Sequence, residues 1–600
     1  MDDRGKTQDR TNDRKLIRRM LEFAKPYWFY FVISLILIFT ITGASLARPY
    51  LTKVGIDKYI NGVVKSTMSI EEARHGIWTL GIMFLVLIIV EFILGYLQRY
   101  ILELTGKKII YNIRERIFNH VQHLPLSFFD KMAAGRIVTR VTNDPETINE
   151  MFSGVLVGFI RSMVEMIAII IVMFRLSSRL TTVSFMVLPL IVVATIIFRR
   201  TARKVWQMIR TKLAEINAFL AEHIAGIGII QAFNMQDRKA QEFDKVNREY
   251  FDAHMKSVKV FGIFRPFMDV VETLGMALLL WYGGRSILAG ALEFGTLYMF
   301  VDYIGRFYWP IRELTEQFNT LQNSIVSAER VFNLLDQEVE PRIEGTIPDY
   351  DNMVGEIEFK NVWFAYIDEN WVLKDISFKI KPGESAAFVG ATGAGKTSII
   401  NLLCGFYEHQ RGEILIDGVD IRDIGKEKLR QNIGLVLQDV SLFSGDIATN
   451  IKLFEPDISM EEVVKASKHV NAHEFISKLY GAYDHEIGEG GTTLSVGQRQ
   501  LISFARALIR NPKILVMDEA TSHVDTETEE LIQDALINLM KGRTTIAVAH
   551  RLSTIQNADK IILIHRGRIR EMGNHQELLS KRGLYYNLYR LQYDPEYKVG

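Results

Sequence analysis

The sequence predicts a protein in two parts, an all-α membrane domain of six helices followed by an α/β domain. Six long apolar stretches lie within the first 320 of the 600 residues. A Gly-rich segment, Gly390–Thr397, stands between a short apolar run and a stretch that can form a helix. Farther on, the apolar run Ile514–Met517 ends in two carboxylates, Asp518 and Glu519. The first observation is typical of membrane domains, and the other two of α/β domains that hold a phosphorylated ligand.

Composition excludes several classes of protein. With 71 basic and 70 acidic residues the net charge is +1, so no nucleic-acid partner is implied. Cys404 is the one cysteine, which excludes a disulfide within the chain, and we expect it to serve ordinary packing. Met1–Arg14 is charged and lacks the apolar run of a signal peptide.

The six apolar stretches are each long enough to cross a bilayer, since about 20 helical residues span its ~30 Å hydrocarbon core. The sixth is the weakest, because Asp302, Arg306 and Arg312 interrupt it. The expected spans are Tyr27–Leu46, Ile77–Leu97, Phe152–Phe174, Thr181–Phe198, Phe267–Leu288 and Gly295–Phe318.

Basic residues predict the orientation of the membrane domain. They are frequent before the first span and between the fourth and fifth, whereas Ala289–Phe294, between the fifth and sixth, has no Lys or Arg. Because basic segments stay in the cytoplasm, we expect a multi-pass protein of the cell (inner) membrane with both termini cytoplasmic. Arg14–Lys25 could form an amphipathic helix on the membrane surface.

The connections between spans differ in length. A short turn near Ser177–Ser178 joins the third and fourth spans. Gln98–Met151 and Arg199–Pro266 are long and basic, and we expect them to extend membrane helices into the cytoplasm. Short helices are expected at their tips, His123–Gly135 and Asn217–Phe233.

Ionisable residues also occur inside the spans, where a charge at the bilayer centre costs roughly 2.5–3.5 kcal/mol. Such residues face protein or water rather than lipid, which makes them candidates for a substrate path. Structural pairing, or a position near the interface, is an equally open alternative. The residues are Glu91, Arg161, Glu165, Glu272 and Asp302, of which Glu91, Glu272 and Asp302 are the candidates for a cavity.

A polar segment with two prolines, Leu334–Pro348, predicts a linker. After it, short apolar runs alternate with helical stretches, as in an α/β sheet. The expected strands are Glu356–Phe359, Ser385–Val389, Gly434–Leu437, Ile514–Met517, Thr545–Val548 and Lys560–Ile564.

The segment Gly390–Thr397 fits G-x-x-x-x-G-K-[ST], whose backbone N–H groups wrap a polyphosphate at a helix N-terminus. Lys396 can reach the β- and γ-phosphates, and Thr397 can place its hydroxyl on Mg²⁺. ATP and Mg²⁺ are therefore the expected ligands. The candidate phosphate-binding residues are Gly390, Ala391, Thr392, Gly393, Ala394, Gly395, Lys396, Thr397 and Ser398.

Three further residues complete a hydrolytic site. Asp518 can hold Mg²⁺, and Glu519 can polarise the attacking water. His550 follows the apolar run Thr545–Val548 closely, so it can reach the γ-phosphate. Ligands of parallel α/β sheets bind at these strand ends. We expect an ATP hydrolase with Glu519, His550 and Lys396 as catalytic residues.

With these motifs in this order, the chain resembles an ATP-binding-cassette exporter of the half-transporter type. The resemblance assigns Tyr366 to stacking on adenine and Gln438 to Mg²⁺ and the attacking water. Leu494–Gln498 is similar to the signature that contacts the partner's nucleotide, through Ser495, Val496, Gly497 and Gln498. Asp525 falls in the D-loop, and Glu486–Glu489 resembles the segment that touches the cytoplasmic loops. The loop tips would be coupling helices, one for each nucleotide domain of a dimer.

The resemblance also implies domain boundaries and a function. Residues 1–25 would be the N-terminal segment with its elbow helix, 26–320 the membrane domain, 321–350 the linker and 351–600 the nucleotide-binding domain. The expected function is ATP-driven export of small hydrophobic or amphipathic compounds, in contact with membrane lipids. A lipid flippase and an ATP-gated, channel-like member of the family remain alternatives.

One departure from the family pattern bears on the partner. Val496 replaces a glycine of the signature, and its β-branched side chain adds bulk where the loop must approach the nucleotide. A homodimer would carry this defect in both sites. We therefore expect a heterodimer with a second half-transporter that has an intact signature. Its Walker B strand, the counterpart of Ile514–Glu519 in this chain, would be degenerate.

Overall fold

The computed structural model describes residues 15–340, 353–518, 526–548 and 555–593. The chain divides into two compact units. The first comprises Met1–Gln122 and Ala134–Gln337, and the second comprises His123–Ala133 and Glu338–Gly600. The tip segment His123–Ala133 therefore groups with the second unit, although the residues on both sides of it belong to the first.

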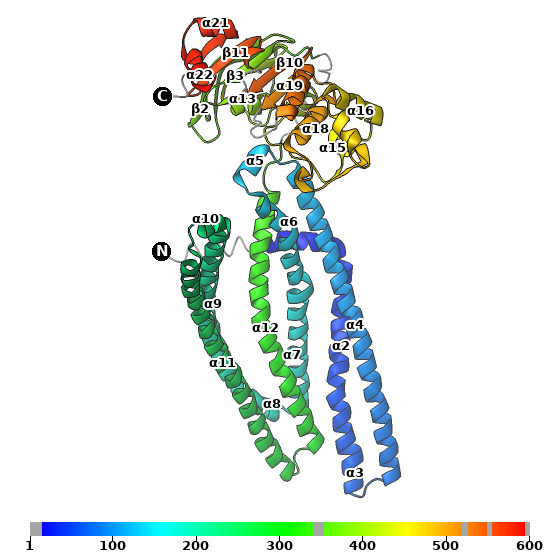
Figure 1. The fold of residues 1–600 in the computed structure, drawn as a ribbon. Helices are drawn as coiled ribbons and strands as arrows, with labels where there is room; N and C mark the ends of the chain where they lie inside the picture. Colours follow the sequence, from blue (N-terminus) through cyan, green and yellow to red (C-terminus); the bar gives the residue numbers. More distant parts are fainter. Residues whose placement is uncertain (1–14, 341–352, 519–525, 549–554, 594–600) are drawn as a thin grey trace. The chain divides into compact units, whose positions relative to one another are not determined.

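The first unit is entirely helical in its described residues (Figure 1). Helices α2 and α4 pack together, α9 packs along α11, and α12 contacts α2, α6, α7 and α11. The long helices are α2 (Trp28–Val54), α4 (Ile70–Gln122), α6 (Ala134–Asn149), α7 (Val157–Leu176), α9 (Leu188–Ala225), α11 (Gln236–Leu288) and α12 (Phe294–Leu335). The shorter helices are η1 (Lys25–Tyr27), η2 (Gly55–Ile60), α3 (Asn61–Val64), η3 (Glu150–Leu156), α8 (Ser178–Ser184), η4 (Phe185–Val187) and α10 (Ile227–Ala232).

Two of the helices are far longer than a bilayer is thick. Helices α4 and α11 have 53 residues each. At 1.5 Å per residue each reaches about 80 Å, against ~30 Å of hydrocarbon. The predicted helical extensions beyond the spans are thus confirmed. Their predicted tips hold the short helices α5 (Leu126–Lys131), which lies in the second unit, and α10.

Length and composition alone make four of the described helical stretches candidates to cross a membrane. They are Lys15–Val64, Ile70–Gln122, Ala134–Leu176 and Ser178–Ala225. The first four predicted spans lie within them. The fifth and sixth predicted spans, Phe267–Leu288 and Gly295–Phe318, lie in α11 and α12.

The segment before the first span is a helix over residues 15–24. Leu16, Met20 and Ala24 recur at intervals of four residues and are buried, so this helix is amphipathic as predicted. On its other side the Arg19 guanidinium binds the Asp336 carboxylate in two bonds of 2.6 and 2.7 Å. This ion pair ties the N-terminal helix to the end of α12.

The structure changes the start of the predicted linker. Helix α12 continues to Leu335, so residues 321–335 are helical rather than extended. Val331 and Phe332 follow Ala328 by three and four residues, and all three are buried, which gives this polar stretch the apolar face that a helix needs.

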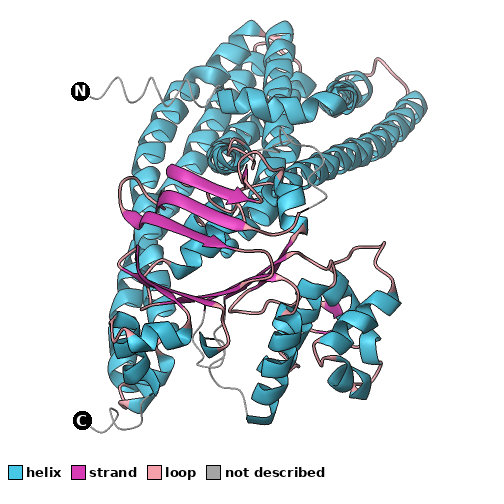
Figure 2. Cartoon of the chain, turned by 90° about the horizontal axis from the view of Figure 1, so that it is seen from above, coloured by secondary structure: helices cyan, strands magenta, loops and turns pink. Residues whose placement is uncertain are grey.

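The second unit holds two main sheets (Figure 2). A six-stranded sheet has the order β12-β11-β3-β10-β9-β6, with only β12 antiparallel, and a four-stranded antiparallel sheet has the order β2-β1-β4-β5. The strands are β1 (Ile357–Ala365), β2 (Trp371–Ile380), β3 (Ser385–Val389), β4 (Arg411–Ile416), β5 (Val419–Asp420), β6 (Ile433–Val436), β7 (Gly445–Asp446), β8 (Glu486–Ile487), β9 (Ile514–Asp518), β10 (Thr544–Val548), β11 (Lys560–His565) and β12 (Arg568–Gly573). All six predicted strands coincide with or overlap one of these.

Helices complete the second unit. Helix α13 follows β3, and α18 and α19 pack together beside β6 and β9. The helices are α13 (Lys396–Leu403), α14 (Lys426–Gln431), α15 (Ile447–Lys452), α16 (Met460–His469), α17 (His473–Lys478), η5 (Ala482–Asp484), η6 (Glu489–Gly491), α18 (Val496–Leu508), α19 (Thr526–Met540), α21 (His575–Ser580) and α22 (Leu584–Tyr593). Cys404 is buried in the core, where burial raises its pKa to about 12, so it packs as a neutral thiol.

Candidate nucleotide-binding and hydrolytic site

The Gly-rich loop connects β3, a central strand of the parallel sheet, to α13. Gly395, the residue before the helix, has a φ of +106°, and a Cβ there would lie 2.6 Å from Cδ2 of Leu373. A Cβ on Gly390 would collide with the carbonyl oxygen of Ile564 on β11. Glycine is thus required at both ends of the loop, and a loop of this kind before a helix N-terminus can offer its backbone N–H groups to phosphate.

Lys396 is folded back over this loop. Its Nζ donates to the carbonyl oxygens of Gly390, at 2.7 Å, and Ala391, at 3.2 Å. Burial lowers the pKa of Lys396, and the charge of Asp518 opposes that shift. An ammonium group held among backbone groups at the centre of the loop is placed to neutralise phosphate oxygens.

Thr397 and Asp518 meet although 121 residues separate them in the chain. The Thr397 hydroxyl donates to Oδ2 of Asp518 at 3.2 Å, which joins the first turn of α13 to the end of β9. A hydroxyl and a carboxylate are hard oxygen donors of the kind that Mg²⁺ prefers, so these residues fit the metal. Gln438 lies two residues beyond β6, which runs parallel to β9 with Val436 opposite Met517, so it follows the same end of the sheet.

Tyr366 lies directly after β1 and beside α13. Its hydroxyl accepts a hydrogen bond from Nδ2 of Asn401 at 3.3 Å and is 3.0 Å from Oγ of Ser398. The residue as a whole is 40% exposed. The structure thus holds an accessible aromatic face next to the phosphate loop, an arrangement that suits stacking on a base.

The candidate signature forms the start of α18. Ser495 caps the helix: its Oγ accepts from the backbone N–H of Gln498 at 3.2 Å, while the Gln498 side chain accepts from the Ser495 N–H at 3.0 Å. Gly497 is buried, but Val496, the first residue of the helix, is 46% exposed. Valine is therefore accommodated within this chain, and its bulk is presented on the surface.

Three of the predicted site residues, Glu519, Asp525 and His550, lie outside the described residues. The strands that lead to Glu519 and His550, β9 and β10, are adjacent and parallel, with Val548 opposite Asp518.

A residue that sequence reasoning missed is Tyr407. Its hydroxyl donates a hydrogen bond to the carboxylate of Asp130, which follows Phe128 and Phe129 in α5. Burial of the Tyr407 phenol and this hydrogen bond raise the pKa of Tyr407. Its ring meets the Tyr366 ring edge-on, with centroids 4.9 Å apart. The short helix α5 is thus linked to Tyr366, the candidate for adenine stacking, through the side chain of Tyr407. No local pattern signals a contact between residues 277 positions apart.

Replacing Tyr407 by Phe is expected to lower the amount of substrate transported per ATP two- to fivefold. The aromatic ring at this position still contacts Tyr366, but the hydrogen bond to Asp130 is lost. A hydrogen bond to a charged group that is partly exposed is worth about 1 kcal/mol. Transport and ATPase rates of the reconstituted protein measure this ratio. Tyr480→Phe, at a tyrosine that is 97% exposed, is the matched control. An unchanged ratio in Tyr407→Phe would show that the contact carries no coupling.

Two of the charges predicted inside the spans lie in ion pairs. Arg48 Nη2 lies 3.3 Å from the Glu91 carboxylate, and Arg306 Nε lies 2.7 Å from that of Asp302. Arg306 also donates to the carbonyl oxygen of Ser45 at 3.1 Å. Glu272 is half-buried on α11. Two of the three cavity candidates, Glu91 and Asp302, therefore have an ion-pair partner.

The all-helical unit with membrane-length apolar helices, joined to an α/β unit with a phosphate loop, defines an ATP-driven membrane transport protein. Residues 31–311 match the family model of the ABC transporter transmembrane region, and residues 373–522 match that of the ABC transporter. The chain belongs to the ABC transporter family and is an ABC exporter, which couples ATP hydrolysis to transport. Both the predicted fold class and the predicted enzymatic activity are confirmed.

Similar proteins come from several bacteria. The chain is 39% identical over 93% of its length to the Bacillus subtilis protein named "Probable multidrug resistance ABC transporter ATP-binding/permease protein YheH", of which it covers 82%. It is 34% identical over 98% of its length to the ATP-dependent lipid A-core flippase of Syntrophus aciditrophicus, of which it covers 96%. A solved bacterial Atm1-family ABC exporter with ATP bound matches with a TM-score of 0.76, at 27% identity, over 94% of this chain and 98% of the other.

Proposed function

We propose that this exporter uses ATP to move small hydrophobic or amphipathic compounds across the cell membrane by alternating access. The nucleotide site supports the proposal: Lys396, Thr397 and Asp518 are assembled at the start of α13 in a chain whose helices suit a membrane. ATP shifts the conformational equilibrium only as far as it binds the closed state more tightly, and hydrolysis resets the cycle. The multidrug-resistance name of one relative is the reason to favour drug-like substrates.

In this proposal the site residues divide the work. Tyr366 and the loop Gly390–Ser398 hold the nucleotide, and Thr397, Gln438 and Asp518 hold Mg²⁺, which supplies charge neutralisation on the phosphates. Glu519 and His550 orient the attacking water and the γ-phosphate. The signature residues Ser495–Gln498, with Asp525, serve the nucleotide bound to the partner.

The proposed topology places both termini in the cytoplasm, with domains at residues 1–25, 26–320, 321–350 and 351–600. Within the membrane domain, we propose that Glu91, Glu272 and Asp302 line the substrate path. Glu91 and Asp302 each form an ion pair whose net charge is zero. This pairing lowers the free-energy cost of burying the two carboxylates, and it suits a path for uncharged or amphipathic compounds.

A lipid flippase is the second candidate, favoured by the lipid A-core flippase among the relatives. Inside-out vesicles that hold the exporter and its partner separate the candidates. The proposal expects ATP-dependent accumulation of a fluorescent hydrophobic cation against its gradient, without movement of a fluorescent phospholipid between leaflets. Phospholipid movement alone would favour the flippase. Flux of the cation only down its gradient would favour an ATP-gated channel, and both of these results would overturn the proposal.

We further propose that the partner is a different chain. Exporters of this family act as dimers in the membrane. Helix α10 leaves Ile227, Ile229 and Phe233 exposed by 50, 68 and 74%, an apolar surface that suits docking on a second chain. Val496 is exposed where the partner's nucleotide would bind, so two copies of this chain would crowd both sites.

The purified chain alone is expected to hydrolyse ATP slowly, and Val496→Gly is expected to raise its rate by about tenfold. The glycine removes a Cβ and two methyl groups from the surface that closes on nucleotide, while the Ser495–Gln498 cap of α18 remains. ATPase rates measure the effect, and Val470→Gly, at a buried valine of the same unit, shows what a merely structural loss does. Rapid hydrolysis by the unaltered chain without a second polypeptide would refute the heterodimer.

A further inference from the structure

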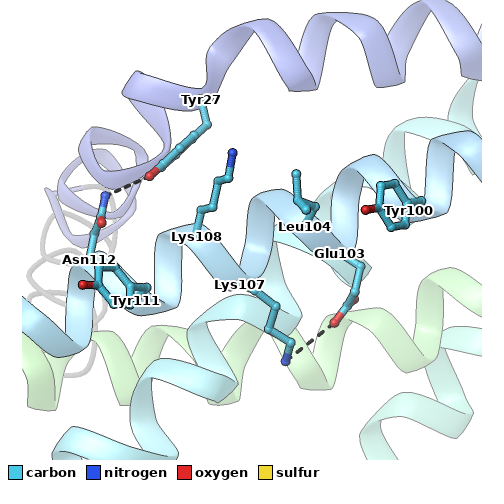
Figure 3. A pocket seen from close by; sticks show the side chains of 8 residues that line it. All are labelled: Tyr27, Tyr100, Glu103, Leu104, Lys107, Lys108, Tyr111 and Asn112. Carbon is cyan, nitrogen blue, oxygen red and sulfur yellow. Dashed lines mark hydrogen bonds and ion pairs between the residues drawn. The ribbon is translucent and has the colours of Figure 1, made fainter.

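A pocket of about 450 Å³ lies in the first unit where the N-terminal helix leads into α2 (Figure 3). Tyr27 closes it on one side, and α4 supplies the rest of its wall. Its volume is in the range of small-ligand sites, ~300–1,000 Å³. The lining residues are Tyr27, Tyr100, Glu103, Leu104, Lys107, Lys108, Tyr111 and Asn112.

The wall formed by α4 is one face of that helix. Tyr100, Glu103, Leu104, Lys107, Lys108 and Tyr111 are spaced by three or four residues, the spacing of side chains on a common face. Tyr100 lies three residues, or about 4.5 Å, beyond the second predicted span, and Tyr27 begins the first. The predicted spans thus place the pocket at the membrane boundary, on the side where the chain begins.

The two lysines of the pocket differ in their partners. Lys107 is neutralised: its Nζ lies 2.8 Å from Glu146 and 3.6 Å from Glu103. Lys108 has no ion pair among the described residues, and its Nζ lies 5.3 Å from the centre of the Tyr30 ring. The pocket thus carries one cationic group that is held by an aromatic ring and available to an anion.

A hydrogen-bond donor accompanies this charge. The Tyr27 hydroxyl accepts from Nδ2 of Asn112 at 3.0 Å, so its own proton is free to be donated. In Figure 3 the Lys108 side chain rises from α4 beneath Tyr27. The ammonium group of Lys108, the phenol of Tyr27 and the apolar side chain of Leu104 thus line the same pocket.

We propose that this pocket binds the phosphate headgroup of an anionic phospholipid of the membrane that surrounds the exporter. Lys108 and Tyr27 would contact the phosphate. The acyl chains would continue along α2 and α4 toward the membrane interior, where Trp28, Phe29 and Tyr96 are 62, 59 and 67% exposed. Tyrosine and lysine together are typical of the membrane–water interface, and a basic residue there attracts anionic lipid. These exposed aromatic side chains favour a lipid over a soluble phosphate.

Native mass spectrometry of the full exporter in detergent, with its partner if it has one, tests this inference. It counts bound phosphatidylglycerol and phosphatidylcholine of the same acyl chains, with glycerol phosphate as the soluble competitor. We expect preferential retention of phosphatidylglycerol, a five- to tenfold loss of its affinity in Lys108→Ala, and recovery in Lys108→Arg. Tyr27→Phe, which keeps the ring, is expected to lose two- to threefold.

The matched control is Lys58→Ala. Lys58 also lies over a tyrosine, with its Nζ 5.4 Å from the Tyr59 ring centre, but outside the pocket. Equal retention of the two lipids would show that only uncharged lipid coats this surface. Full competition by glycerol phosphate would indicate a site for a soluble anion. An equal loss in Lys58→Ala and Lys108→Ala would show a diffuse charge effect. Each of these three results would overturn the proposal.

Discussion

Replacing Glu519 by Gln is expected to lower the ATPase rate at least 100-fold while ATP stays bound. A positioned general base contributes ~10²–10⁴-fold, and the amide cannot polarise water as the carboxylate does. The neighbouring Asp518 still meets Thr397 at 3.2 Å, so the phosphate and metal contacts are expected to survive. The trapped nucleotide would hold the dimer in its closed state.

Steady-state ATPase rates and retention of a fluorescent ATP analogue measure both parts of this expectation. Glu530→Gln makes the same change at an exposed position of α19 and should leave the rate unaltered. A rate in Glu519→Gln within about threefold of the unaltered exporter would contradict the role of general base. Weak nucleotide retention together with a low rate would instead assign Glu519 to binding.

Replacing Lys396 by Ala is expected to cost about 10²- to 10³-fold in ATPase activity and to weaken ATP binding as well. The structure holds this ammonium at the centre of the phosphate loop through its bonds to Gly390 and Ala391, and a preorganised cation there stabilises charge in the ground state and the transition state. The effect on binding distinguishes this variant from Glu519→Gln.

ATP affinity, ATPase rate and thermal unfolding are measured together for this variant. Lys381→Ala, at an exposed lysine just before β3, is the control for loss of a positive charge from the same unit. An unchanged ATP affinity in Lys396→Ala would remove the lysine from the phosphate site. A lower unfolding temperature without loss of affinity would show that its bonds to the loop serve folding alone.

Local patterns made most of the nucleotide-binding unit predictable. The loop Gly390–Thr397, the strand before it and the helix after it are neighbours in the chain, so their chemistry is legible from spacing alone. The strand that ends in Asp518 was predicted in the same way. Because ends of parallel strands share an edge of the sheet, the approach of Asp518 to Thr397 could also be expected.

Elsewhere the local pattern was insufficient. The expected linker boundary at residue 321 lies inside α12, which runs to Leu335, and Arg19, more than 300 residues earlier, binds Asp336 just beyond it. The charge of Glu91 in a span left a substrate path and a structural pair equally open. Its carboxylate lies 3.3 Å from Nη2 of Arg48 on α2, and only the packing of α2 on α4 could bring these two side chains together.

The sequence by itself determined the apolar helices, the order of the nucleotide motifs and the departure at Val496, because each depends on residues close together in the chain. Only the tertiary structure decided that Tyr407 joins Asp130 to the ring of Tyr366, and that Lys108 stands beneath Tyr27 in a pocket. Those contacts join elements far apart in sequence. Their positions depend on how whole helices and strands pack, and the periodicity of apolar residues along the sequence does not specify that packing.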